Sequence, residues 1–339
     1  MSIGGFFLLF LSSSCRPADP TTPQSEQTAE SPCDPSSVET LIPCVSTARW
    51  SRDLAVLAAG PRPPGSKHWQ IAQDLCASRF AELGYTVERH QYDTGVNVIG
   101  ILPGTSADQV VLSAHYDGVE ACPAADDNAS GVAGVLEAAR VLAAGRYAGT
   151  LVVACWDDEE NGLVGSRAWT ARASDRDEPI LASFVFEMIG YRTDQPDTQR
   201  LPPGVDLVFP AQVEWLRQRQ NRGDFIAVVA DTGSYWAVNR LETRAAELGL
   251  PTLVVEIPTL LLATPLAEPL FRSDHASFWE HGYPGILITD TADYRYARYH
   301  CAAAPDSPDA LDPEFATLVV RSTVAAIVDT LGLSVPPSS

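Results

Sequence analysis

The stretch that decides the fold is residues 150–160, with the sequence TLVVACWDDEE. After its opening threonine, the part over 150–156 is continuously apolar, as in a strand inside a sheet that is covered on both faces. Upstream, residues 129–144 and 66–83 place apolar side chains at helical spacing. Strands that alternate with helices predict a three-layer α/β/α sandwich around a mixed, mostly parallel central sheet.

The same alternation runs through most of the chain. Strands are expected over residues 85–92, 96–102, 109–114, 150–156, 181–186, 225–230 and 284–289. Helices are expected over residues 48–59, 66–83, 129–144, 235–248, 273–281 and 313–331. No internal repeat is present, and these elements predict a single catalytic domain over residues 47–333.

Composition narrows the class of protein. The 339 residues are 45% hydrophobic and 19% charged, which is typical of a soluble globular protein with a sizeable core. The formal net charge of −20 argues against nucleic acid and anionic membrane surfaces as partners.

The N-terminal segment has the pattern of an export signal. The apolar run 6–11 is followed by three serines and Cys15, which resembles a bacterial lipoprotein signal over residues 1–15 with Cys15 as the lipidated residue. No Lys or Arg precedes the run, so an ordinary secretory signal or a misplaced start stays open. Residues 16–46 are expected to form a tether and entrance segment. We therefore expect an exported protein, periplasmic or at the cell surface, with a possible lipid anchor.

Cysteine usage is consistent with an oxidising compartment. The seven cysteines are at positions 15, 33, 44, 76, 122, 155 and 301. Without Cys15 their number is even, and Cys33 with Cys44 is a candidate local bridge. Cys122 and Cys301 lie in expected loops and could pair, although the sequence does not fix the connectivity.

Side chains of the kinds that bind metal ions lie at the ends of three expected strands. His115 follows the first, the pair Glu159 and Glu160 follows the second, and Glu187 follows the third. Ligands of such sheets bind beyond the carboxyl ends of the strands. We therefore expect these side chains to meet in one crevice.

Two further side chains complete a ligand set. Asp126 precedes Asp127 at a helix start, where one carboxylate can cap the helix while the other projects outward; capping alone is the simpler alternative. His275 follows Asp274 near another helix start. With His115, Glu160 and Glu187 they give two imidazoles and three carboxylates, which suit Zn²⁺. The role of His300 is left open: it could line the pocket wall, donate a hydrogen bond or be an ordinary loop histidine.

The adjacent residues Glu159 and Glu160 suggest two different roles, metal binding for one and proton transfer for the other. Neighbouring carboxylates repel unless a metal or a proton separates their charge. One can bind metal while the other takes a proton from a zinc-activated water. Asp117 lies two residues after His115 on an extended segment, where it can support the imidazole from behind.

Five ordered motifs together resemble a known family. They are AHYD at 114–117, ADDNASG at 125–131, EENGLVGS at 159–166, MIGY at 188–191 and SDHA at 273–276. In this order they resemble the co-catalytic di-zinc aminopeptidases of metallopeptidase family 28, over about residues 47–331. The resemblance implies the zinc-dependent exopeptidase fold, which is phosphorylase/hydrolase-like.

The resemblance also implies a role for each ligand. It assigns His115 and Glu187 to one zinc, Glu160 and His275 to a second zinc, and Asp126 to a bridge between both. The expected cofactor is therefore Zn²⁺, two per chain.

The implied activity is hydrolysis of the N-terminal amide bond of a peptide or aminoacyl substrate. Glu159 is the implied general base and acid, and Asp117 supports His115. At the position of Glu187 this family usually has Asp, so the longer side chain could alter metal affinity or preference at that zinc.

Two alternatives are weighed against a peptidase. A glutaminyl-peptide cyclotransferase has the same fold with a single zinc, but that branch lacks the intact Asp126–Asp127 pair and has a longer segment after the double Glu. A non-catalytic, peptidase-like binding ectodomain would have lost metal ligands, and none is missing here.

Overall fold

The computed structural model describes residues 1–2, 33–264 and 267–333. Most of the expected signal segment, including Cys15, and the tether up to residue 32 lie outside the described residues. The chain from Cys33 onward groups into one compact unit. No helix in the described part is long and apolar enough to cross a membrane.

The entrance segment joins the core. Helix α1 (Val38–Leu41) is capped by Ser37, and both of its terminal apolar side chains are buried in the main core. The folded unit therefore begins before residue 47, because this short helix supplies apolar surface that would otherwise face water.

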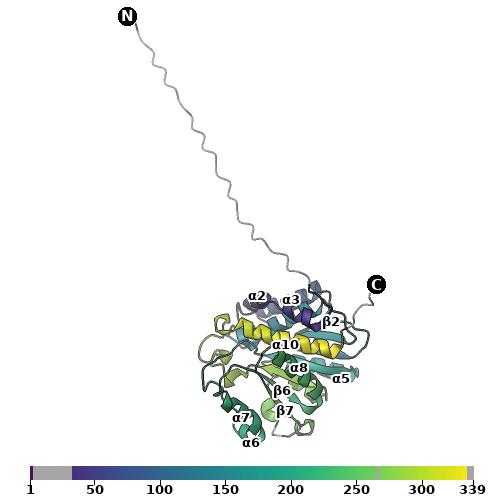
Figure 1. The fold of residues 1–339 in the computed structure, drawn as a ribbon. Helices are drawn as coiled ribbons and strands as arrows, with labels where there is room; N and C mark the ends of the chain where they lie inside the picture. The colour runs from purple at the N-terminus through teal and green to yellow at the C-terminus, as the bar shows by residue number, and fades with distance from the viewer. Residues whose placement is uncertain (3–32, 265–266, 334–339) are drawn as a thin grey trace. The chain divides into compact units, whose positions relative to one another are not determined.

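An eight-stranded sheet forms the centre of the protein, in the order β1-β2-β4-β3-β5-β8-β6-β7 (Figure 1). Its strands are β1 (Thr86–Gln91), β2 (Val96–Leu102), β3 (Gln109–His115), β4 (Thr150–Trp156), β5 (Ile180–Glu187), β6 (Ile226–Asp231), β7 (Thr252–Ile257) and β8 (Gly285–Thr289). Four neighbouring pairs are parallel. The other three are antiparallel, so the mixed sheet matches the prediction.

Helices cover both faces of this sheet. Besides α1 they are α2 (Thr47–Leu57), α3 (Lys67–Glu82), α4 (Gly131–Leu142), α5 (Val164–Asp175), α6 (Val205–Val208), α7 (Pro210–Gln218), α8 (Tyr235–Glu247), α9 (His275–Glu280) and α10 (Pro313–Leu331). Side chains from α2, α3, α4, α8 and α10 share one core with alternate strand residues such as Val110 and Leu112. Val111 points to the opposite face, where Trp169 of α5 and Phe278 of α9 pack. The result is the expected three-layer sandwich.

Local sequence signals correctly predicted the start of some helices. Ser66 caps α3 by accepting the backbone N–H of Trp69, as its position before the helical pattern predicted. Strand β7 and helices α5, α6 and α7 were not expected. Strand β7 lies at the sheet edge and pairs only with β6, so its place depends on a partner distant from any local pattern.

Candidate metal centre

Three strand ends meet as the sequence indicated. His115 closes β3 and pairs in register with Trp156 of β4, so the turn after β4 starts level with it. Glu187 closes β5 on the other side of β3. The Nε2 atom of His115 lies 3.3 Å from Oε2 of Glu187 and 3.9 Å from Oε2 of Glu159. These three side chains form the first group that could hold a metal ion.

A second such group lies beside the first. It consists of Asp127, Glu160 and His300. The Nε2 atom of His300 lies 3.2 Å from Oδ2 of Asp127 and 3.2 Å from Oε2 of Glu160. The other oxygen of Asp127, Oδ1, lies 3.5 Å from Nε2 of His115. Asp127 therefore presents one carboxylate oxygen to each group.

Asp126, the expected bridging residue, belongs to neither group. Its Oδ1 accepts the backbone N–H of Gly190 at 2.9 Å, and its carbonyl accepts the hydroxyl of Ser130. Burial, followed by repulsion from Asp290 and Asp306, raises the pKa of Asp126 well above its ordinary value. This geometry corrects the expectation: Asp126 fastens the turn to the end of β5, and its neighbour Asp127 faces the centre.

His275 is also placed outside both groups. Its Nε2 lies 2.8 Å from the carbonyl oxygen of Leu270, and its ring packs edge-on against Trp279 with 4.6 Å between centroids. Burial lowers the pKa of His275 to about 4, so the ring is neutral. The structure therefore does not support His275 as a ligand and places His300 at the second group instead.

Asp117 supports two parts of the centre at once. Its Oδ1 lies 3.3 Å from Nδ1 of His115, so that Nε2 of the same ring faces the other carboxylates. The two oxygens of Asp117 also accept the backbone N–H groups of Glu159 and Glu160 at 3.1 and 3.2 Å. Fully buried, Asp117 fixes both the imidazole and the turn that carries the glutamate pair.

Glu187 is held from two sides. The hydroxyl of Ser273 donates to its Oε2 at 2.7 Å, and the side-chain amide of Asn128 lies 3.4 Å from the same atom. Asn128 also bonds the carbonyl of Phe186 and the N–H of Met188 through its two amide atoms. The SDH motif at 273–275 thus contributes an orienting serine rather than a ligand.

The loop before Asp126 is tied to a buried cation. The guanidinium of Arg62 is fully buried and donates to the carbonyls of Leu57, Tyr116, Pro123 and Ala124, each at 2.8 Å. Burial lowers the pKa of Arg62, and the attraction of nearby carboxylates, Asp127 first among them, opposes that shift. Arg62 therefore anchors this loop and offsets part of the negative charge of the centre.

Electrostatics and unpaired atoms favour a cation here. Burial raises the pKa of Glu160 to about 7, and burial also raises the pKa of Glu159 well above its ordinary value despite the attraction of His115. Hydrogen bonds to Asp127 and Glu160 raise the pKa of His300 to about 10. Nε2 of His115 and Oε1 of Glu160 are buried without a hydrogen-bond partner. Bound metal ions would satisfy these atoms, and the mixed imidazole and carboxylate set suits zinc.

An apolar cavity opens beside Glu187. Its volume is about 170 Å³, and it lies between α6–α7 and the strands β6, β7 and β8. Its walls include Val205, Phe209, Val213, Leu216, Leu253 and Leu270. A hydrophobic side chain of a substrate could occupy such a space, because apolar surface gains by leaving water.

Comparison with known proteins agrees with this geometry. A model of peptidase family M28 matches residues 97–225, a range that contains His115, Asp127, Glu160 and Glu187. The uncharacterized protein YfbL of Escherichia coli K12 is 34% identical over 229 residues. That match spans 64% of this chain and 66% of YfbL.

The chain belongs to peptidase family M28. Among M28 relatives, leucine aminopeptidase 1 of Aspergillus fumigatus is 27% identical over 235 residues, which is 65% of this chain and 52% of the relative. The chain thus spans between half and two thirds of these curated relatives. A zinc aminopeptidase of Bacillus subtilis has the same fold, with a TM-score of 0.65 at 15% identity, covering 85% of this chain and 96% of that structure.

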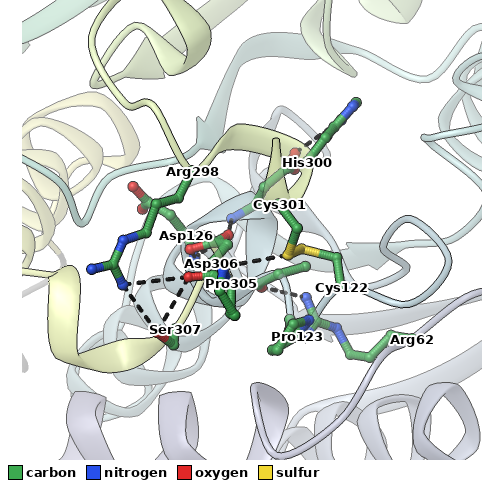
Figure 2. The surroundings of a disulfide bond; sticks show 12 residues. Arg62, Cys122, Pro123, Asp126, Arg298, His300, Cys301, Pro305, Asp306 and Ser307 are labelled. Carbon is green, nitrogen blue, oxygen red and sulfur yellow. Dashed lines mark hydrogen bonds and ion pairs between the residues drawn. A yellow bond between two sulfur atoms is a disulfide. The ribbon is translucent and has the colours of Figure 1, made fainter. Parts of the chain in front are cut away.

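One member of this M28 centre was missed from the sequence. His300 lies in a loop beyond the family match, with no strand or helix pattern to mark it. A usable signal was nevertheless present, because Cys301 follows it directly and pairs with Cys122 in the loop before Asp126 (Figure 2). Cys33 and Cys44, the other candidate pair, carry free thiols.

Proposed function

We propose that this M28 protein is an aminopeptidase-type zinc metallopeptidase with two zinc ions per chain. The observation that carries the proposal is Asp127, whose two oxygens face His115 and His300 respectively. One carboxylate between two ligand groups is the arrangement that a two-metal hydrolase requires. Similarity to a leucine aminopeptidase and to a zinc aminopeptidase supports the same activity.

In this proposal each group of side chains holds one zinc. His115 and Glu187 would hold the first, Glu160 and His300 would hold the second, and Asp127 would offer one oxygen to each. Bound zinc would polarise the substrate carbonyl and make a water molecule more acidic. Asp117 keeps the imidazole of His115 and the turn after β4 in place, as its contacts to both indicate.

Glu159 is the proposed general base. It lies in the first group, 3.9 Å from Nε2 of His115, on the turn that also carries Glu160. In the proposed reaction its carboxylate accepts a proton from the attacking water and passes it to the nitrogen of the leaving amine. Since Glu160 is used as a ligand in this scheme, Glu159 is the neighbouring carboxylate free to transfer the proton.

The apolar cavity beside Glu187 is the proposed site for the side chain of the N-terminal residue. Its walls are mostly aliphatic, so we expect leucine-like and aromatic residues to be preferred over charged ones. We further propose that the protein is exported. The Cys122–Cys301 disulfide supports this proposal, because such bonds persist in oxidising compartments.

The test combines metal analysis with a substrate panel. Purified protein should hold about two zinc ions per chain and hydrolyse aminoacyl amides, leucyl amide faster than glutamyl amide. Activity should disappear with a strong chelator and return with added zinc. A protein that is fully active with one tightly held metal would contradict the two-zinc proposal and favour the cyclotransferase. A chain that binds zinc but hydrolyses none of the panel would contradict the peptidase assignment.

A further inference from the structure

The Cys122–Cys301 disulfide joins two loops at the edge of the metal centre (Figure 2). Its cysteines are 179 residues apart in the sequence. Cys301 follows His300 directly, and Cys122 lies four residues before Asp126. The covalent link therefore connects the segment of one candidate ligand to the loop that leads into another.

The His300 segment has a strained backbone. His300 and Cys301 have φ angles of 51° and 58°, so two consecutive residues other than glycine lie in the left-handed region. This conformation is disfavoured and persists only where surrounding contacts determine it. The side chain of His300 is 38% exposed, and its ring stacks on the neighbouring Tyr299. Besides the disulfide, the turn is held by backbone hydrogen bonds from Cys301 to Arg298 and from Ala302 to Tyr299, and the ring of His300 lies against Asp127 and Glu160.

The Cys122 side of the bond is firmly held. Cys122 is buried, and the two residues that follow it offer their carbonyls to the buried guanidinium of Arg62. Figure 2 shows Arg62 beside Pro123, on the far side of the disulfide from His300. The bond thus fastens a strained turn to a loop that Arg62 holds in place.

Asp306 continues the same connection toward Asp127. Its carboxylate accepts the backbone N–H groups of Asp126 and Asp127, and it receives the hydroxyl of Tyr296. Its own backbone N–H points at Sγ of Cys301 at 3.2 Å. The disulfide and Asp306 therefore connect the segment of His300 to the backbone of Asp127.

We propose that the Cys122–Cys301 disulfide is the positioning element of the second zinc site. It fixes the turn so that His300 faces Asp127 and Glu160. Without the bond, His300 leaves this position and the second zinc is held weakly, while the His115–Glu187 site keeps its zinc. This inference rests on the proposed two-zinc function.

The experiment compares two double variants of the full chain. Cys122→Ser with Cys301→Ser removes the disulfide, and Cys33→Ser with Cys44→Ser is the control, with equal substitutions in thiols away from the centre. Zinc affinity is measured by competition with a chromophoric chelator, and site geometry by the absorption spectrum of cobalt added stepwise. We expect the disulfide variant to bind the second equivalent at least about tenfold more weakly, a loss typical of disturbed ligand orientation. The first equivalent, and both equivalents in the control, should be unchanged.

The outcomes separate the two proposals. If wild-type protein binds two zinc ions and the disulfide variant binds both with wild-type affinity, the positioning role is wrong and the proposed function stands. A wild-type stoichiometry of one would overturn both. If the disulfide variant does not fold, the disulfide of the zinc-loaded wild-type protein is reduced in place with a phosphine. The disulfide oxidises the phosphine, and water supplies the oxygen of the phosphine oxide and one proton to each sulfur. Release of one zinc with an unchanged near-ultraviolet dichroism spectrum supports the inference, and release of both together refutes it.

Discussion

Replacing Glu159 with glutamine tests the proposed proton transfer. Glutamine keeps the size and shape of the side chain but cannot accept a proton. General acid–base catalysis contributes about 10²- to 10⁴-fold in rate. We therefore expect turnover to fall by at least about 10²-fold, or about 2.7 kcal/mol in activation free energy.

The structure also predicts what Glu159→Gln should leave intact. The backbone N–H of residue 159 makes the bond to Asp117, so the turn keeps its anchor whatever the side chain. In the metal-free protein, burial and neighbouring carboxylates raise the pKa of Glu159 well above its ordinary value of 4.5. An acid with a raised folded-state pKa destabilises the fold once pH exceeds the unfolded-state pKa. Above about pH 4.5 the metal-free variant should therefore unfold at a temperature equal to or higher than wild type.

The assay measures three quantities side by side. Steady-state hydrolysis of leucyl amide gives kcat and KM, elemental analysis gives zinc content, and thermal unfolding gives Tm. Because the lost step is chemical, kcat should fall while KM changes little. Glu160→Gln is the matched control, since the same substitution one residue later should lose zinc. The reasoning is refuted if Glu159→Gln keeps most of its turnover, or if it loses zinc as severely as Glu160→Gln.

Four further outcomes are expected. Asp117→Asn should fold normally but weaken zinc binding or activity by about 10- to 100-fold, seen in chelator titration, because it loses its charge beside His115; wild-type zinc affinity would contradict this role. His300→Ala should lose one zinc by elemental analysis, whereas His275→Ala should keep both and lower the free energy of unfolding by about 2 kcal/mol through lost packing and a lost hydrogen bond; the reverse pattern would restore the sequence-based assignment. Val213→Trp should fill the cavity and lower kcat/KM for leucyl amide about tenfold with little change for alanyl amide; equal losses would exclude the cavity as the side-chain site. Deleting residues 1–32 should give soluble, active enzyme, since the compact unit begins at Cys33; aggregation of that protein would show otherwise.

Patterns of apolar residues were sufficient for most of the sheet. The run 150–156 is buried on both faces, so its continuously apolar composition was enough to predict a strand in the interior of the sheet. Edge strand β7 has only half-buried residues at most positions and a neighbour on one side. Helix α5 has glycine, serine and threonine among its buried residues, so its helical period is weak in the sequence. Both elements are determined by tertiary packing more than by local preference.

The local sequence could not show which of two adjacent aspartates faces the metal centre. Asp126 and Asp127 are adjacent carboxylates, and backbone direction alone decides which one faces the centre. Asp127 has φ −102° and ψ 89°, outside the helical region, and helix α4 starts only at Gly131. The expected helix from residue 129 therefore misled the choice between them.

His300 posed a different difficulty. Its partners in the second group come from the turn after β4 and from the segment before α4, and the sequence around His300 gives no sign of either contact. His275, by contrast, has a strong local motif, which here serves packing and the orientation of Glu187 through Ser273. A sequence motif identifies residues that a fold depends on, but it does not separate a ligand from a residue that supports one.

The position of β8 in the sheet has a consequence for synthesis and turnover of the chain. This strand is the last of the eight in sequence, yet it lies in the interior, parallel to β5 and antiparallel to β6. Until Gly285–Thr289 has left the ribosome, β5 and β6 each present an unpaired edge, and the sheet remains in two pieces. A chain ended by a premature stop before β8 is therefore an aggregation-prone product with open strand edges, and quality control must remove it.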